Sequence, residues 1–406
     1  DTVWLFLAVD IRHSAWLQAL GKLTSTETQT IRRLNKPMSI FRATSIMLLT
    51  AFSAGCSLIM PRLLPFDDLP QPSGDFAVGT QIMNWTDDSR TEWFTDIAGD
   101  KRRLVVQVWY PTAESSGAPY PYVDNPQQRL TPLAKQMGLP RFLIDHIQYV
   151  KTNALTDAVP LAGMPQAPVI LFSHGLGGMK GQNSVQAEEF ASLGYIVVAI
   201  DHPFDAYLTI FEDGSTADYR SAEPHALTPE EFWAFRSPQL ATRAADISFL
   251  LDKLTTLNEP EEGLWGMLDL QRIGIFGHSF GGATSIMAAA TDPRIKASVA
   301  LDGWMIPIPE ERIAAGLQTP FLYIGQSQWD DPVNYQKLDS LIANSTPLGT
   351  KLLLDGTKHF DFSDTPQFSK FSKRLGISGS LPREQLKLTL NAEMMTFFNT
   401  YVRDSH

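Results

Sequence analysis

The stretch that decides the fold is Ile273-Gly-Ile-Phe-Gly-His-Ser-Phe-Gly-Gly282, which is followed by the helix-forming run Ala283-Thr-Ser-Ile-Met-Ala-Ala-Ala290. A buried strand, a Gly-x-Ser-x-Gly turn and a helix in this order are typical of a nucleophile elbow. Gly277 and Gly281 are needed there because a side chain at either position would collide with neighbouring backbone in so tight a turn. The sequence therefore predicts that Ser279 is a nucleophile, held clear of a sheet at a helix N-terminus that favours negative charge.

Short apolar runs recur along the chain and alternate with segments of helical spacing. The runs predicted as strands buried on both faces are 169–172, 195–200, 273–276, 297–301, 321–324 and 351–354. Segments 187–193 and 241–254 place apolar residues on one face of a helix. Segment 103–110 alternates in part and ends at Pro111, as expected for an early antiparallel strand. This alternation predicts the α/β class, with a mostly parallel central sheet covered by helices on both faces.

Two stretches depart from this rhythm and are predicted as insertions. They are 111–165, which is rich in Pro and aromatic residues, and 208–239, which is polar with Trp233 and Phe235. Long irregular insertions in α/β proteins form either lids and substrate walls or surface decoration, and both interpretations stay open.

Composition excludes several classes of protein. The 406 residues are 44% hydrophobic and 19% charged, which favours a folded globular chain over a disordered or multi-span membrane protein. Acidic residues outnumber basic ones by 44 to 33, so we expect no nucleic-acid partner. The single Cys excludes an internal disulfide, and the absence of clustered Cys and His spacing predicts no metal and no cofactor.

The segment from Met38 to the single Cys has the pattern of an export signal. Arg42 comes early, an apolar stretch follows, and Ser53-Ala-Gly-Cys56 ends it with small residues. We predict a signal peptide over 38–55 and export from a bacterial cell. The small residues before Cys56 resemble a lipoprotein processing site, although Ser53 stands where Leu is usual. A secreted or periplasmic protein and an outer-membrane lipoprotein anchored in the membrane through lipidated Cys56 therefore both stay open.

The remaining chain is predicted to form one catalytic domain over 56–406, carrying the two insertions. Residues 1–37 precede the internal start at Met38 and are predicted to be an upstream or non-native segment without a role in the fold.

A serine hydroxyl needs a base to remove its proton, and after a nucleophile elbow the partners follow in the order Ser, acid, His. Only two histidines follow Ser279 in the sequence, His359 and the terminal His406. His359 comes after the last predicted strand, whereas a chain end frays. Elimination therefore predicts His359 as the general base.

The acid has two candidate positions. Asp302 directly follows the predicted strand 297–301, whereas Asp330 and Asp331 lie several residues beyond 321–324, where turn formation or helix capping would explain them. Either position can present a carboxylate to His359, and spacing alone prefers Asp302 only modestly.

Several motifs in order resemble the plasma-type (type II) platelet-activating factor acetylhydrolase family of α/β-hydrolases, over roughly 104–371. They are Val106-Gln-Val-Trp-Tyr-Pro111, Phe172-Ser-His-Gly-Leu-Gly177, Gly277-His-Ser-Phe-Gly-Gly282, Ala300-Leu-Asp-Gly-Trp-Met305 and Lys358-His-Phe-Asp-Phe-Ser363. The resemblance implies the α/β-hydrolase fold and assigns the acid to Asp302. It also implies an oxyanion hole made by the backbone N–H groups of Leu176 and Phe280. Trp304, beside the acid, is predicted to form a wall of the substrate pocket.

The expected function is that of a serine carboxylic-ester hydrolase, an esterase or lipase that works through an acyl-enzyme. The resemblance implies short or truncated acyl esters of lipid-like substrates. A triacylglycerol lipase, a polyester hydrolase of the polylactide or cutinase type, a serine peptidase and an acyltransferase stay open as alternatives. A non-catalytic binding protein with the same fold, which is an alternative from another functional class, stays open as well.

Overall fold

The structure is a computed structural model that describes residues 60–223, 226–258, 264–345 and 349–404. The predicted upstream segment 1–37, the predicted signal peptide 38–55 and Cys56 lie outside the described residues. Within the described ranges, no helix is both long and apolar enough to cross a membrane.

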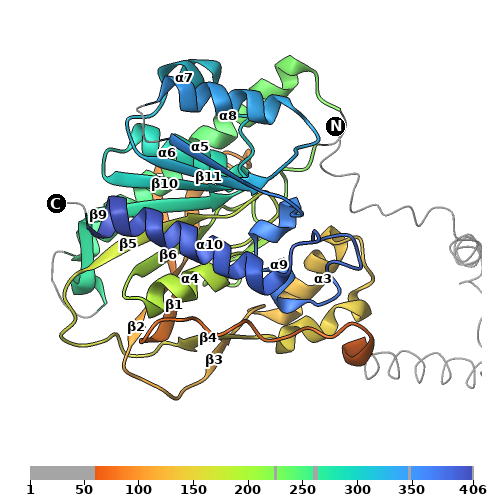
Figure 1. Cartoon of the computed structure of the whole chain (residues 1–406), viewed down its shortest axis with the longest axis vertical. Helices are drawn as coiled ribbons and strands as arrows, with labels where there is room; N and C mark the ends of the chain where they lie inside the picture. The colour runs from red at the N-terminus through yellow and green to blue at the C-terminus, as the bar shows by residue number, and fades with distance from the viewer. Residues whose placement is uncertain (1–59, 224–225, 259–263, 346–348, 405–406) are drawn as a thin grey trace, which may run out of the picture.

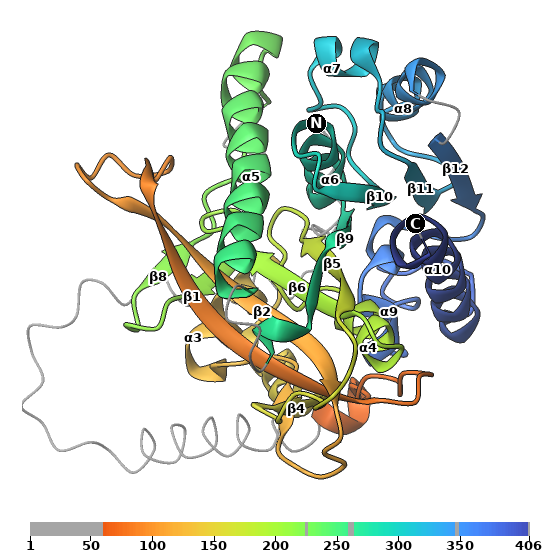
Figure 2. The same ribbon diagram turned by 90° about the vertical axis from the view of Figure 1, so that its left-hand side faces the viewer.

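A ten-stranded sheet runs through the described part of the chain (Figures 1 and 2). In sheet order its strands are β12 (Gly349–Leu354), β11 (Phe321–Gln326), β10 (Ile295–Leu301), β9 (Leu268–His278), β5 (Ala167–Ser173), β6 (Ile196–Asp201), β2 (Lys101–Thr112), β1 (Ala77–Thr91), β4 (Lys151–Thr156) and β3 (Pro119–Pro121). Neighbours from β12 to β6 are parallel, whereas β2 is antiparallel to both β6 and β1. The predicted mostly parallel sheet and the early antiparallel strand are confirmed.

Helices cover both faces of this sheet, as predicted. On one face lie α4 (Ser184–Ser192) and α10 (Arg383–Phe398); on the other lie α5 (Pro229–Asn258) and α6 (Phe280–Thr291), as Figure 2 shows. Two further helices, α7 (Glu310–Ala315) and α8 (Val333–Asn344), join the α6 side through a third apolar cluster. The fold is that of an α/β-hydrolase.

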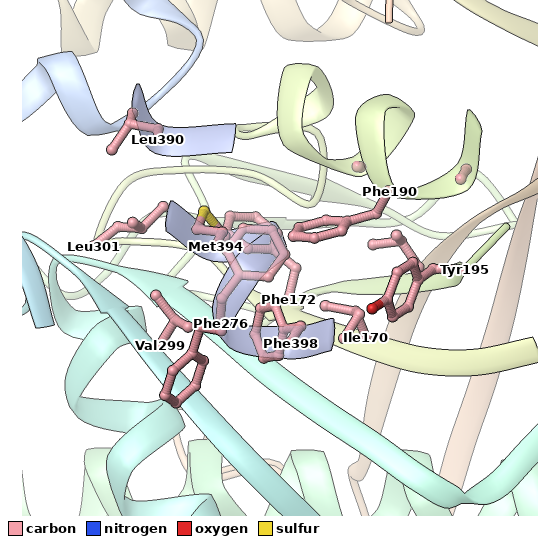
Figure 3. Packing of buried hydrophobic residues seen from close by; sticks show 14 of the residues in the cluster. Ile170, Phe172, Phe190, Tyr195, Phe276, Val299, Leu301, Leu390, Met394 and Phe398 are labelled. Atoms are coloured by element: carbon pink, nitrogen blue, oxygen red, sulfur yellow. The ribbon is translucent and has the colours of Figure 1, made fainter. Parts of the chain in front are cut away.

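Alternate residues of the central strands supply the two cores. On β5, Ile170 and Phe172 pack toward α4 and α10, whereas Val169 and Leu171 pack toward α5 and α6. Figure 3 shows the first core, where the ring of Phe190 on α4 lies 5.6 Å from that of Phe398 on α10. Each such buried side chain contributes about 1.5–3 kcal/mol, so these two layers hold the strand ends in place.

The edge strand β12 corrects one sequence prediction. Segment 351–354 was expected to be buried on both faces, but all six residues of β12 are partly or fully exposed. The reason is that β12 is the last strand of the sheet: it pairs with β11 along one edge, and its other edge has no neighbouring strand in the described part of the chain.

Both predicted insertions contain regular structure. Segment 111–165 holds α3 (Pro126–Gln136), β3 and β4, and β4 pairs with β1 to widen the sheet. Segment 208–239 holds a hairpin of β7 (Leu208–Ile210) with β8 (Thr216–Asp218) and the first third of α5.

The start of α5 was missed although the sequence carries its signal. Thr228 Oγ1 accepts the N–H of Glu231, and the Glu231 carboxylate accepts the N–H of Thr228, which is a capping box with Pro229 at the first helical position. Pro238 inside the helix argued against one continuous element, because proline usually breaks a helix.

Strand order creates the location of the site. The chain runs from β5 through α4 to β6, then returns through α5 to β9 on the other side of β5. In an open α/β sheet, such a reversal leaves a crevice at the carboxyl ends of the strands on either side. The residues that follow β5 and β9 are therefore neighbours, and Ser173 is in register with Gly277.

Candidate active site

Ser279 joins β9 to α6 in a strained turn. Its backbone has φ 57° and ψ −121°, a region that costs a serine about 1–3 kcal/mol, and its side chain is half-buried. A Cβ on Gly277 would lie 2.1 Å from the carbonyl oxygen of Gly281, and one on Gly281 would lie 1.9 Å from that of Ser173. Only glycine fits at these two positions, as the elbow pattern predicted.

His359 and Asp302 come together at the same edge of the sheet. His359 begins the short helix η5 (His359–Phe362) after β12, and its Nδ1 lies 2.7 Å from Oδ2 of Asp302, which follows β10. A carboxylate only accepts, so the ring donates through Nδ1–H and leaves Nε2 as an acceptor. The ring also lies 4.6 Å from that of His278, the chain neighbour of Ser279.

The Asp302 carboxylate is fully buried but well supplied with donors. Besides His359, it accepts hydrogen bonds from the Gln326 N–H at 3.0 Å, Gln326 Nε2 at 3.0 Å and Trp329 Nε1 at 3.0 Å. Donors at this density compensate for the removal of a charged group from water.

The alternative acids lie elsewhere. Asp331 is exposed near the start of α8, where its carboxylate accepts the N–H of Val333 at 2.9 Å, and Asp330 beside it is exposed too. That is the turn-forming role which sequence reasoning offered for this pair as an alternative to catalysis.

The loop after β5 passes beside Ser279, because a Cβ on Gly175 would lie 3.1 Å from the Cβ of Ser279. The carbonyl of Gly175 accepts hydrogen bonds from His174 Nδ1 at 2.6 Å and the Gly178 N–H at 3.0 Å. In a trans peptide the N–H of Leu176 points the opposite way. Among the described residues, neither this N–H nor that of Phe280, the first residue of α6, has a hydrogen-bond acceptor.

His174 can serve as a donor because its tautomer is set. Its Nε2 accepts the backbone N–H of His202 at 3.0 Å, so the proton resides on Nδ1. Burial, with the nearby Arg243 guanidinium and His202, lowers the pKa of His174 well below its usual value and keeps the ring neutral.

Trp304 lies next to the elbow, where sequence reasoning placed a wall of the pocket. Its backbone N–H donates to the Ser279 carbonyl at 2.9 Å, and its ring lies 5.8 Å from that of Phe280. The ring of Phe232, from the first turn of α5 within the second insertion, lies 6.0 Å from that of Trp304 in a T-shaped arrangement. Phe280 is fully buried, whereas Trp304 and Phe232 are half-buried, so these two rings form an aromatic surface between the elbow and α5.

Three polar residues around the site escaped the sequence analysis. Gln326 and Trp329 lie around the end of β11, shortly before the candidate acids Asp330 and Asp331, and Gln182 lies before α4. Gln326 is the last residue of β11 and Trp329 follows soon after it, and this position was the available signal, since residues at the carboxyl ends of parallel strands gather at one edge of the sheet. Gln182 lies well beyond the end of β5 and carried no such signal. Among the described residues, no group of three or more His, Cys, Asp or Glu side chains is arranged to hold a metal ion.

Comparison with known proteins connects this geometry to a family. Residues 65–403 match the family described as platelet-activating factor acetylhydrolase, isoform II. A platelet-activating factor acetylhydrolase from Gallus gallus is 28% identical over 223 residues, which are 48% of this chain and 52% of that protein. One from Canis lupus familiaris is 26% identical over 319 residues, which are 73% of this chain and 68% of that protein.

A solved structure shares the architecture. The ferulic acid esterase from Streptomyces cinnamoneus has a TM-score of 0.68 and 25% identity, covering 84% of this chain and 94% of that one. The match of the family profile to most of the chain and the likeness to an esterase agree with the nucleophile elbow and the His–Asp pair. The chain belongs to the family of platelet-activating factor acetylhydrolase, isoform II.

Proposed function

We propose that the protein is a serine hydrolase that cleaves carboxylic esters, with Ser279 as nucleophile, His359 as general base and Asp302 as the acid that orients it. The observation that carries this assignment is the 2.7 Å hydrogen bond from His359 Nδ1 to Asp302, with the His359 ring 4.6 Å from that of His278, which precedes Ser279 on the strained elbow. Family membership and the esterase neighbour support ester hydrolysis over the binding-protein alternative.

The reaction follows from the donors and acceptors at the sheet edge. Ser279 Oγ attacks the ester carbonyl while His359 Nε2 takes its proton, and the negative carbonyl oxygen accepts the N–H groups of Leu176 and Phe280. One such donor contributes about 3 kcal/mol to the transition state. His359 returns the proton to the leaving alcohol, and a water molecule then releases the acid from the acyl-enzyme by the same steps.

The proposed substrates are short or truncated acyl esters of a lipid-like alcohol. Support comes from the names of the Gallus and Canis relatives and from the aromatic surface of Trp304 and Phe232 near the nucleophile. The acyl chain would pack on this surface, with Trp304 as its wall.

Hydrolysis of p-nitrophenyl esters from acetyl to palmitoyl, with Ser279→Ala as the control, tests this proposal. We expect activity on short chains that disappears in Ser279→Ala, together with covalent labelling of Ser279 by a fluorophosphonate. Strong activity on palmitoyl esters or on polyester films would instead favour a triacylglycerol lipase or a polyester hydrolase. Absence of both labelling and serine-dependent hydrolysis would refute the proposal that the protein is a serine hydrolase.

We also propose that 38–55 directs export and that 56–406 is the exported catalytic domain. The support is the sequence pattern that ends at Cys56. Expression in a bacterial host, followed by mass spectrometry of the N-terminal peptide, distinguishes the two forms: a diacylated or triacylated Cys56 indicates a lipoprotein, and a free thiol indicates plain secretion. An unprocessed N-terminus would contradict export.

A further inference from the structure

A continuous chain of side-chain hydrogen bonds links the loop that carries Leu176 to His359. Gln182 Oε1 accepts the N–H of Gly175 at 2.8 Å, and Gln182 Nε2 lies 3.0 Å from His278 Nδ1. His278 Nε2 in turn lies 3.0 Å from the backbone oxygen of His359. The chain therefore connects segments that follow β5 and β12.

The direction of every bond in this chain is determined by its two ends. The carbonyl of His359 only accepts, so the proton of His278 resides on Nε2 and Nδ1 is an acceptor. Gln182 Nε2 must then donate to His278 Nδ1. This leaves Gln182 Oε1 to accept from the N–H of Gly175, which can only donate. One arrangement satisfies all three bonds, and it requires a neutral His278.

The surroundings of His278 favour that neutral form. The ring is buried, and burial together with the adjacent His359 lowers the pKa of His278 well below its usual value. A second proton on Nδ1 would also face the Gln182 amide N–H₂ and break the chain.

The sheet alone does not hold the two ends in relation to each other. Between β5 and β12 lie β9, β10 and β11, so no strand pairing joins the loop after β5 to the loop that carries His359. The start of α4 supplies a second connection: Asp364 donates its N–H to the Gln182 carbonyl at 3.0 Å, and its carboxylate accepts the N–H groups of Ser184 at 2.7 Å and Val185 at 3.0 Å.

We propose that Gln182 and His278 are positioning residues that set the oxyanion donor of Leu176 and the base His359 at a fixed separation. The inference rests on the proposed function of Leu176 and His359. Neither residue touches the substrate. Gln182 fixes the Gly175 peptide before the donor, and His278 fixes the backbone of the base. Because both ends act in the transition state, loss of the chain lowers kcat and leaves KM nearly unchanged.

Substitution of Gln182 tests the chain. Gln182→Leu keeps the side-chain size and removes both bonds, and Gln182→Glu keeps the acceptor for Gly175 but cannot donate to His278. We expect kcat on p-nitrophenyl acetate to fall about 10-fold to 100-fold in both variants, with KM within about 2-fold, because small misplacements of catalytic groups cost this much. Gln186→Leu is the matched control, since it removes the amide of a nearby glutamine, on α4, whose hydrogen bonds go to Asn183 and Asn391 and not to Gly175 or His278, and it should retain kcat within about 2-fold.

A spectroscopic measurement on the unaltered full chain keeps the inference falsifiable if a variant fails to fold. With 15N-labelled histidine, long-range 1H–15N correlations should show His278 as the neutral Nε2–H tautomer, with His278→Asn providing the assignment. In Gln182→Glu the ring should become doubly protonated, because the carboxylate accepts from Nδ1–H while the His359 carbonyl still requires Nε2–H.

The outcomes separate this inference from the proposed function. Hydrolysis that does not depend on Ser279 would refute the function, and the inference with it. Serine-dependent hydrolysis with Gln182→Leu matching Gln186→Leu would overturn the inference alone. So would an Nδ1–H tautomer of His278 in the unaltered protein.

Discussion

Replacing Asp302 by Asn tests the assignment of the acid most directly. All four hydrogen bonds to this carboxylate come from donors: Oδ2 accepts from His359 Nδ1 and Gln326 Nε2, and Oδ1 accepts from the Gln326 N–H and Trp329 Nε1. An asparagine amide therefore places its N–H₂ against two donors in either orientation. Each unpaired buried donor costs about 1–3 kcal/mol.

Of the two orientations of the amide in Asp302→Asn, the one with the lower free-energy cost is the one that impairs catalysis. With N–H₂ in place of Oδ2, His359 relieves the clash by moving its proton from Nδ1 to Nε2, whereas in place of Oδ1 the N–H₂ faces a backbone N–H that cannot change. A proton on Nε2 prevents His359 from accepting the proton of Ser279. We expect kcat to fall by about 10⁴, which corresponds to about 5.4 kcal/mol of transition-state stabilisation.

The assay is steady-state hydrolysis of p-nitrophenyl acetate, with thermal unfolding of each variant to establish that it is folded. Asp331→Asn is the matched control, because the exposed side chain of Asp331 serves a turn, and it should stay within about 2-fold of the unaltered protein. A folded Asp302→Asn that keeps more than about a tenth of the activity would refute the reasoning. So would a loss of the same size in Asp331→Asn.

Three further predictions follow from individual contacts. Trp329→Phe removes one donor to the buried acid and should lower kcat about 10-fold with KM unchanged, and an unchanged kcat would contradict it. Gly281→Ala should cost at least about 3 kcal/mol in urea unfolding, because its Cβ would lie 1.9 Å from a backbone oxygen of β5. Gly117→Ala, whose Cβ would lie 3.6 Å from its nearest neighbour, should cost less than about 1 kcal/mol, and equal costs would count against the steric argument. Burial raises the pKa of Glu188 from 4.5 to about 7, so its contribution to stability is fully present below pH 4.5 and is lost as the pH rises through 7. Glu188→Gln should therefore gain up to about 3 kcal/mol relative to the unaltered protein between pH 4.5 and 7.5, and a constant difference across that range would contradict the assignment.

The parts of the fold that the sequence predicts are those that local patterns determine. Continuous apolar runs mark strands buried on both faces, and the elbow glycines are required by contacts within a few residues of Ser279 and with the adjacent strand. His359 was reached by elimination, and the structure places it against Asp302. In each case, one short segment carried enough information.

The parts that escaped prediction depend on strand order. The exposure of β12 follows from its place at the end of the sheet, which its apolar run does not reveal. Gln182 reaches the site from the chain before α4, and Gln326 and Trp329 reach it from the end of β11. Which partner each side chain contacts depends on the order of the strands in the sheet. The sequence motifs predicted the reactive groups but not the polar side chains that hydrogen-bond to them.

The precision of the site comes from the sheet, although its reactive residues lie just beyond the strands. The Ser279 N–H donates to the Leu301 carbonyl of β10 at 3.0 Å, and the Asp302 N–H donates to the Ile324 carbonyl of β11 at 2.6 Å. Each residue therefore continues the strand ladder by one bond and then turns sharply, with φ of 57° at Ser279 and 43° at Asp302. Strain of about 1–3 kcal/mol at each position persists only because the flanking ladder and core are rigid. Asp accepts a left-handed backbone more readily than most residues, so position 302 suits aspartate for its conformation as well as for its charge.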